Sequence, residues 1–349
     1  MTTPKKIAVL GAGANGASIG ADLTRAGLDV VLIDQWPAHV EAMRSRGAVI
    51  EMPDETLTVP VRAFHLCDVC TFTEPFDIVL LVTKAYDTRW SCELIKPYLA
   101  PGGLVACVQN GMTADTIADV VGAERTIGCV IEISSMMFDP GVVLRHSPPP
   151  RSWFAVGAID PRAKNREAEI AGLLRHVGSV EVVEDIRATK WMKLVSNATT
   201  LVTTAILGVP MLEAVAMPGM RELMLRSGQE ALDTGMALGH RPLPIFGLKP
   251  EDIRATNRLV ETLLDTLLEG FVLPHTKTTV LQDWIKGRHS EVDDLNGLVV
   301  AEGAARGIPT PVNAAVVEIA RRIERHELTP DPSNLALLLD RAGRANTQA

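Results

Sequence analysis

A glycine-rich hexapeptide near the start of the chain constrains the fold more than any other feature. The apolar segment KIAVL, residues 6–10, runs directly into GAGANG, residues 11–16, and a helical pattern over residues 14–26 leads to Gly27. A strand, a GxGxxG turn and a helix in this order indicate the first βα turn of a dinucleotide-binding unit. The N-terminus of such a helix attracts phosphate, because its N–H groups are free and the helix dipole is positive there.

The three glycines of the motif have separate predicted roles. Gly11 makes the tight turn, Gly13 lets the backbone approach a pyrophosphate, and Gly16 allows the helix to pack on the strand. Asn15, inside the same turn, is also predicted to contact the cofactor. The alternative is a glycine-rich turn without a ligand, but the flanking strands and helix favour the binding motif.

An acidic residue ends the second predicted strand, DVVLID, at residues 29–34. Asp34 lies 18 residues after Gly16, where a carboxylate accepts hydrogen bonds from the adenosine ribose and repels a 2′-phosphate. The next residue is Gln35, so no arginine is placed to hold that phosphate. The pattern favours NAD over NADP without excluding NADP, and a surface aspartate at a strand end is the alternative reading.

The distribution of apolar residues predicts an α/β fold with two domains. Apolar runs at 77–83 and 104–108 are too continuous for half-exposed strands, so they indicate a parallel sheet that is covered on both faces. Further strands at 127–134, 142–146 and 153–158 are expected to extend that sheet. We therefore predict an N-terminal Rossmann-type parallel sheet domain at 1–184, followed by an all-α C-terminal domain at 185–349.

The C-terminal domain is predicted from long helical patterns. Its last helix places apolar residues on one stripe at the spacing of an amphipathic helix. The final nine residues, RAGRANTQA, are expected to fray. The predicted helices span residues 186–207, 211–238, 250–270, 275–287, 290–306 and 311–326.

Composition excludes several classes of function. The chain has 349 residues, of which 47% are hydrophobic, and its formal net charge of −8 argues against nucleic acid or an anionic membrane as a partner. We find neither a secretory leader nor a run of about 18 apolar residues, so we expect a cytoplasmic protein that does not span a membrane.

Cysteine and histidine spacing gives no metal site. The five cysteines are an odd number in a chain without a leader, which indicates reduced thiols. Cys67 and Cys70 form a CxxC pair, but two further zinc ligands at suitable spacing are missing. Methionines at 211–224 are read as filling a core or a dimer interface.

Polar residues follow several of the predicted strands and helices. Lys84 and Asn110 each come just after a buried strand. Lys193 and Asn197 are four residues apart and share one helix face, where an ammonium and an amide could hold a polar substrate. The same spacing also fits a solvated helix face. Near the C-terminal end, SEVDDLNG at 290–297 combines three acids with an asparagine and a glycine.

Together these segments resemble the ketopantoate reductase (2-dehydropantoate 2-reductase) family, and the resemblance runs the whole length. Its most specific part is the SEVDDLNG segment. The matching segments are GAGANG, the strand-end Lys84, QNG at 109–111, KxxxN at 193–197, LQD at 281–283, SEVDDLNG at 290–297, and the late GIPTPVN and DPSNL.

The resemblance implies a reaction and roles for residues. Hydride passes between a nicotinamide and the carbonyl carbon of a 2-oxo acid, with Lys193 as the general acid or base. Glu291 orients that lysine and a substrate hydroxyl. Asn110 contacts nicotinamide and substrate. The remaining positions carried over are Asn197 and Thr279 at the substrate and Lys84 near the adenosine.

Two departures from the family pattern bear on specificity. Where the family usually has an arginine for the 2′-phosphate, this chain has Gln35 after Asp34, which strengthens the expectation of NAD. Where the family typically has another asparagine one turn after Asn197, this chain has Leu201. An apolar residue there argues against ketopantoate as the best substrate.

Three functions stay open at this point. The first is a reductase of a small 2-oxo acid, and the second is an NAD-dependent catabolic dehydrogenase of a more apolar hydroxy substrate. The third is a dinucleotide sensor without catalysis, which the intact Lys193, Asn197 and Glu291 disfavour. A small-molecule substrate and a homodimer are expected.

Overall fold

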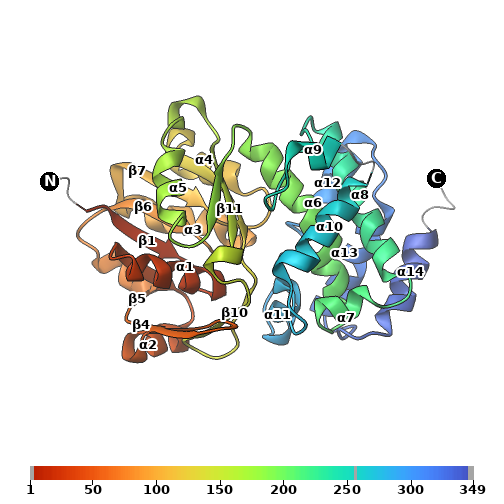
Figure 1. Ribbon diagram of the computed structural model, residues 1–349, viewed down its shortest axis with the longest axis horizontal. Coiled ribbons are helices and arrows are strands. Elements are labelled where there is room, and N and C mark those ends of the chain that lie inside the picture. The colour runs from red at the N-terminus through yellow and green to blue at the C-terminus, as the bar shows by residue number, and fades with distance from the viewer. Residues whose placement is uncertain (1–3, 255–257, 345–349) are drawn as a thin grey trace. The chain divides into compact units, whose positions relative to one another are not determined.

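The structure is a computed structural model that describes residues 4–254 and 258–344. The chain divides into two compact units, Met1–Arg187 and Ala188–Ala349, here called unit 1 and unit 2. Unit 1 contains all the described strands, whereas unit 2 is built from helices (Figure 1). An α/β fold with a Rossmann-type sheet domain followed by a helical domain is therefore confirmed.

An eight-stranded main sheet forms the centre of unit 1. Its strand order is β12-β11-β8-β7-β6-β1-β2-β5, and every neighbouring pair is parallel except β8 and β11. The strands are β1 (Lys6–Leu10), β2 (Asp29–Asp34), β5 (Arg62–His65), β6 (Phe76–Leu81), β7 (Leu99–Cys107), β8 (Thr126–Glu132), β11 (Trp153–Ala158) and β12 (Ser179–Val182).

The strand order reverses direction at β1. From there the chain builds β2 and β5 on one side, then returns to build β6, β7 and β8 on the other. The carboxyl ends of these parallel strands meet at one edge, and the point of reversal is where open α/β sheets bind ligands. β1 is covered on both faces, since Ile7, Ala8, Val9 and Leu10 are at most 1% exposed.

Helices and turns connect the strands of unit 1. α1 follows the glycine motif and packs on β1 and β2. The helices are α1 (Ala14–Arg25), α2 (Pro37–Arg46), α3 (Thr88–Ile95), α4 (Ala114–Val121) and α5 (Glu167–Leu174). Short 3-10 turns are η1 (Leu66–Thr71), η2 (Ala85–Asp87), η3 (Lys96–Tyr98), η4 (Ala123–Arg125), η5 (Pro149–Arg151) and η6 (Pro161–Ala163).

A second sheet corrects the expectation for residues 142–146. They were expected to extend the main sheet, but β10 (Val142–Arg145) belongs to a four-stranded sheet in the order β4-β3-β10-β9. The other strands are β3 (Ala48–Glu51), β4 (Thr56–Val59) and β9 (Ser135–Met136). Because β9 and β10, and no crossover helix, join β8 to β11, the latter returns antiparallel, which the expectation of parallel strands missed.

The helices of unit 2 depart from the predicted boundaries at several places. The helix expected over 275–287 is shorter, and the helix at 334–344 was not predicted. The helix expected over 250–270 includes residues 255–257, which lie outside the described residues. The stretch 211–238 is two helices, because Pro218 and the left-handed Gly219 (φ 82°) interrupt it. The helix expected over 290–306 begins only at Asn296. The helices are α6 (Ile186–Ala205), α7 (Met211–Val215), α8 (Met220–Ala237), α9 (Pro250–Arg254), α10 (Leu259–Phe271), α11 (Thr279–Ile285), α12 (Asn296–Arg306), α13 (Pro311–Glu324) and α14 (Asn334–Arg344).

The chain end is only partly described. Of the nine residues expected to fray, 341–344 belong to α14, and 345–349 lie outside the described residues. Among residues 4–254 and 258–344, we find no helix with the length and apolar character needed to cross a membrane.

Helix α6 is buried along its length within the structure. Residues 188–200 are all buried, and α8 approaches α6 closely through two glycines seven residues apart. A Cβ added at Gly228 would lie 2.2 Å from Thr199 Oγ1, and one at Gly235 would lie 2.0 Å from Trp191 Nε1. The indole N–H of Trp191 donates to the Ala231 carbonyl at 2.9 Å. The close packing of α8 thus fixes the position of α6.

Candidate active site

The glycine motif has two glycines that serve the fold and one that leaves room for a ligand. Gly11 has a φ of 94°, and a Cβ there would lie 2.6 Å from Thr83 N. A Cβ at Gly16 would lie 2.1 Å from Gly11 O. A Cβ at Gly13 would meet no described atom within 4 Å, so the fold itself has no need of this glycine. This geometry fits a pyrophosphate that approaches the backbone at Gly13.

Asp34 lies where the sequence places it, at the carboxyl end of β2. Its side chain is 8% exposed, and one carboxylate oxygen accepts a hydrogen bond from the Trp36 N–H at 2.8 Å. The Gly11 N–H donates to Ile33 O at 2.9 Å, so the turn after β1 is tied to the end of β2. Asp34 therefore sits beside the glycine turn, with its carboxylate already oriented by the backbone.

His39 of α2 holds the glycine turn through a hydrogen bond to Ala12 that no sequence pattern predicted. The ring is fully buried, its Nδ1 lies 2.8 Å from the Gly141 N–H, and its Nε2 lies 2.7 Å from Ala12 O. Because the Gly141 N–H can only donate, Nδ1 is the acceptor, and Nε2 carries the proton donated to Ala12. The neutral tautomer thus connects the dinucleotide turn to the second sheet.

Asn15 also contacts the second sheet. The hydroxyl of Ser135 on β9 donates to Asn15 Oδ1 at 2.6 Å. Ser135 comes 120 positions after Asn15, and no local pattern indicated this contact. It orients a side chain that the sequence assigns to the cofactor.

Gln109 organises the edge formed by β6 and β7. Its buried amide nitrogen lies 2.8 Å from Thr83 O, 3.3 Å from Lys84 O and 3.1 Å from Thr88 Oγ1. Its amide oxygen accepts from the Thr113 hydroxyl at 3.1 Å. Two candidate residues, Lys84 and Asn110, are half-buried on either side of this network. The sequence drew attention to Asn110 in the QNG segment, whereas the structure adds Gln109 as the residue that holds both loops.

In unit 2, Lys193 and Asn197 lie on one buried face of α6. Lys193 is 8% exposed and Asn197 is 1% exposed, so the alternative prediction of a solvated helix face is wrong. Lys193 Nζ lies 5.1 Å from the centroid of the Phe246 ring. A buried ammonium with an amide one turn away can hold an oxygen of a substrate and donate a proton to it.

The turn that carries Glu291 is held by Glu324, a residue that no sequence pattern indicated. Glu324 of α13 accepts hydrogen bonds from the Ser290 N–H at 3.0 Å, from the Ser290 hydroxyl at 2.5 Å and from the Trp284 indole at 3.3 Å. Glu291 itself is 3% exposed and precedes α12. The carboxylate of Glu324 thus fixes the backbone on which the predicted catalytic acid is placed.

A second carboxyl lies beside Glu291. Burial, followed by repulsion from Glu291 and Asp293, raises the pKa of the half-buried Asp294 to about 6. This residue is part of SEVDDLNG, but no role was predicted for it. A perturbed carboxyl next to a candidate acid is typical of functional sites.

Asn296 joins that turn to α6. Its amide nitrogen donates to Ala198 O at 3.1 Å and to Asn313 Oδ1 at 2.8 Å, while its own amide oxygen has no hydrogen-bond partner among the described atoms. Asn313 in turn donates to Glu230 Oε2 at 2.7 Å. This buried network connects the LNG end of the motif with the helix of Lys193.

Thr279 starts α11 and is half-buried. Its neighbour Thr278 caps the helix, because the hydroxyl accepts from the Leu281 N–H at 3.3 Å. The capping role therefore belongs to Thr278, and the substrate contact of Thr279 stays a prediction.

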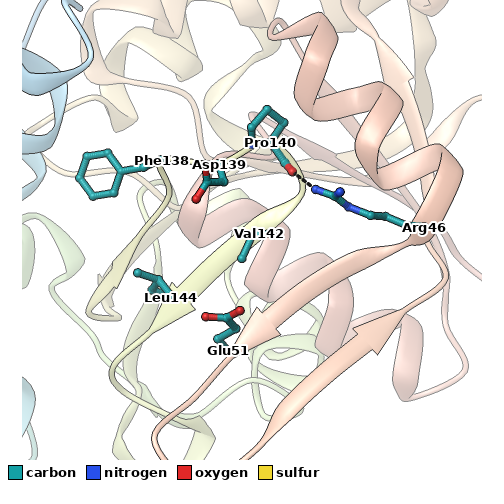
Figure 2. Close-up of a pocket in the computed structure, with 7 residues that line it drawn as sticks. All are labelled: Arg46, Glu51, Phe138, Asp139, Pro140, Val142 and Leu144. Atoms are coloured by element: carbon teal, nitrogen blue, oxygen red, sulfur yellow. Dashed lines mark hydrogen bonds between the residues drawn. The ribbon is translucent and has the colours of Figure 1, made fainter.

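A surface pocket of about 460 Å³ lies on the second sheet of unit 1 (Figure 2). None of the predicted site residues lines it. Figure 2 shows the Arg46 guanidinium donating to the Pro140 carbonyl at one side of the pocket. Within the part of the chain that the structure describes, no group of three or more metal-ligating side chains occurs.

Comparisons with known proteins match this architecture over most of the chain. Residues 7–159 match the family described as "Ketopantoate reductase PanE/ApbA", and residues 185–324 match "Ketopantoate reductase PanE/ApbA C terminal". A 2-dehydropantoate 2-reductase of Caulobacter vibrioides is 30% identical over 90% of this chain and 97% of its own.

Solved structures also match this fold over most of the chain. A PanE/ApbA family ketopantoate reductase from Ralstonia eutropha has a TM-score of 0.76 and 29% identity, covering 92% of this chain and 99% of its own. A D-mandelate dehydrogenase in complex with NADH and anilino(oxo)acetate has a TM-score of 0.80 at 20% identity, with coverage of 92% and 99%, and shares the fold. The chain therefore belongs to the ketopantoate reductase family and is an oxidoreductase that acts on CH–OH groups.

Proposed function

We propose that this protein reduces a small 2-oxo acid with NADH, and that Lys193 donates the proton to the carbonyl oxygen. The observation that carries the proposal is the buried ammonium of Lys193 one helical turn from Asn197. Relatives named 2-dehydropantoate 2-reductase cover 90% or more of this chain, which supports the reaction class.

The residues of unit 2 act on the oxygen of the substrate. A bound nicotinamide supplies or accepts the hydride. Lys193, as an ammonium, hydrogen-bonds the carbonyl oxygen and neutralises the alkoxide that develops on it. In the oxidative direction the neutral amine removes the same proton. Asn197 and Thr279 hold the neighbouring polar group of the substrate, and Glu291 orients Lys193.

Replacement of Lys193 tests the proposal. Lys193→Ala should lower kcat by roughly 10²–10⁴-fold and leave the affinity for NADH nearly unchanged. Lys190→Ala is the matched control, because Lys190 is a buried lysine on the same helix with no proposed role. Wild-type kcat in the Lys193 variant would contradict the assignment. Glu291→Ala should act more on KM if the carboxylate mainly holds substrate.

We propose NAD(H) as the preferred cofactor. Asp34 supports this, because its buried carboxylate at the end of β2 would repel a 2′-phosphate. The proposed cofactor site also includes Lys84, Asn110, Asn15 and the three glycines. The ratio of kcat/KM for NADH to that for NADPH measures the preference, and Asp34→Ala with Gln35→Arg should shift it toward NADPH. A clear preference of the parent protein for NADPH would contradict the proposal.

The substrate is proposed to carry a carboxylate next to the reacting carbon without being optimally ketopantoate. Leu201 supports this, since it is half-exposed on α6 although its neighbours Val202 and Thr200 are buried. A substrate hydroxyl left unpaired beside a leucine costs about 1–3 kcal/mol. Leu201→Asn should raise activity with ketopantoate selectively. Efficient reduction of ketopantoate by the parent protein, with much poorer deoxy analogues, would contradict the idea.

Oxidation of a more apolar hydroxy acid in a catabolic pathway is the second candidate, favoured by Asp34 and Leu201. Initial rates in both directions, with a panel of 2-oxo and 2-hydroxy acids, decide between them. The homodimer and the cytoplasmic location stay predictions, and light scattering of the purified protein tests the first.

A further inference from the structure

The loop between α8 and α9, residues 238–249, is held against the helix that carries Lys193. Near the start of the loop, the ring of His240 stacks on Trp191, with ring centroids 5.3 Å apart and an interplanar angle of 23°. Near its end, the Phe246 ring lies 5.1 Å from Lys193 Nζ. The loop is therefore anchored to α6 at Trp191 and at the candidate proton donor itself.

Phe246 adopts a backbone conformation that is unfavourable for its residue type. Its φ of 63° is in the left-handed region, and the following Gly247 has a φ of 78°. A bulky side chain rarely adopts this conformation, so the surroundings must hold it in place. The ring is 7% exposed and packs on Phe271, with centroids 5.5 Å apart. The strain is thus tied to two contacts of the ring, one with Phe271 and one with the ammonium.

We propose that Phe246 positions the Lys193 ammonium and makes the substrate pocket beside it apolar. This inference rests on the proposed function of Lys193. The face of an aromatic ring attracts a cation within about 6 Å of its centroid, so Phe246 restrains the Nζ atom electrostatically. The flexible lysine side chain then presents its N–H groups in one direction.

The same distance brings the ring close to the substrate. The reacting oxygen must lie about 3 Å from Nζ for proton transfer, so groups on the reacting carbon come near the Phe246 ring. The phenyl ring offers them no hydrogen-bonding group, and Leu201 on α6 offers none either. The favoured substrate class is a 2-oxo acid whose substituent is a branched alkyl or aryl group without a hydroxyl.

Two variants of Phe246 separate the parts of this proposal. Phe246→Leu keeps an apolar side chain but removes the ring face, whereas Phe246→Asn adds hydrogen-bonding groups and tolerates the left-handed backbone. Steady-state rates are measured with NADH and two acids that differ by one hydroxyl, ketopantoate and 3,3-dimethyl-2-oxobutanoate. Both variants should lower kcat by roughly threefold to tenfold through loss of the cation–π contact.

Only the asparagine variant should change the preference. It should shift the ratio of kcat/KM toward ketopantoate by roughly tenfold or more, because a buried hydroxyl then finds a partner. The leucine variant should keep the ratio of the parent protein. An unchanged ratio in Phe246→Asn, or a parent protein that prefers ketopantoate, would overturn the proposal. Thermal unfolding checks each variant, and Phe246→His, which also offers hydrogen-bonding groups and tolerates a positive φ, replaces the asparagine variant if that one does not fold.

A parallel measurement on Lys193→Ala separates the two proposals. If that variant keeps its kcat, the proposed function itself fails. If it loses activity while the Phe246 variants keep both the kcat and the ratio of the parent protein, only the role of Phe246 is wrong.

Discussion

The two units hold their candidate functional residues in different ways. In unit 1 the candidate residues follow the ends of neighbouring parallel strands, with Gly11 after β1, Asp34 at the end of β2 and Lys84 after β6. In unit 2 Lys193 lies inside a buried helix, and Glu291 lies in a turn before another helix. The first arrangement follows from strand order, and the second depends on how helices pack.

The difference determines what each site can tolerate. At the edge of a parallel sheet, the backbone itself brings residues together, and short loops suffice to hold them. In unit 2 the spacing between Lys193 and Glu291 in the chain is large, so remote residues such as Asn296, Glu324 and Gly235 must hold each element. Helical sites should therefore be more sensitive to substitutions away from the chemistry.

The strongest challenge to this comparison is Arg145, a remote buried side chain in unit 1. Its guanidinium is fully buried and contacts Asp22 of α1 at 2.5 Å, Ser147 O at 2.9 Å and Val177 O at 2.9 Å. Arg145→Met should cost about 3–5 kcal/mol of unfolding free energy, because it leaves a buried carboxylate unpaired.

Urea unfolding measures this loss, and hydrogen exchange of α1 locates it in unit 1. Burial already raises the pKa of Asp22 although Arg145 lowers it. The double variant Arg145→Met with Asp22→Leu should therefore recover much of the stability. If the single variant is as stable as the parent protein, unit 1 is held by its backbone alone.

A matched pair of glycine variants tests the difference between the two units. Gly235→Ala should destabilise unit 2 by about 1–3 kcal/mol, since the new Cβ would overlap Trp191. Gly172→Ala in α5 makes the same substitution where a Cβ meets nothing within 4 Å. It should stabilise by about 0.5–1 kcal/mol through helix propensity. Chemical denaturation of both variants checks the sign, and equal effects would remove the contrast.

Gly13→Ala tests whether the glycine turn of unit 1 binds the cofactor through its backbone. Its Cβ would project into open space, so the unfolding free energy should stay near that of the parent protein. The affinity for NADH should fall about tenfold, which corresponds to about 1.4 kcal/mol of lost binding free energy. Fluorescence titration with NADH measures the dissociation constant. Normal affinity would show that the pyrophosphate does not approach this glycine.

The smallest expected effect concerns Asp294 and pH. The pKa of this carboxyl is about 6 in the folded protein and 3.8 for an ordinary aspartate, so the folded state favours the protonated form. The penalty for the ionised form is absent below pH 3.8, develops as pH rises toward 6 and is complete above it. Asp294→Asn should therefore raise Tm by a small amount at pH 8 and leave it unchanged near pH 4.

Partial exposure of Asp294 limits the size of this effect, because solvent screens its repulsion from Glu291. Scanning calorimetry of both proteins at the two pH values measures the difference. A larger Tm gain at pH 4 than at pH 8 would contradict the raised pKa.

The sequence determined the parts of the protein that follow from local rules. The GAGANG turn, the strand ending at Asp34 and the helix starting at residue 186 lie where their patterns predict them. Continuous apolar strands, glycine turns and helical periodicity are encoded within about twenty neighbouring residues, so they can be read without tertiary contacts.

Only the tertiary structure decided which distant residues hold the site. The second sheet places Gly141 against His39 and Ser135 against Asn15, although no local pattern of residues 142–146 distinguished that sheet from the main one. The turn before Asn296 was predicted as part of a helix over 290–306, and the hydrogen bonds from Ser290 to Glu324 hold its start outside the helix. Likewise, Phe246 reaches Lys193 only because the loop between α8 and α9 packs on α6 and α10. Such contacts join residues far apart in the chain, and their free energy arises from burial and hydrogen bonding that no short segment contains.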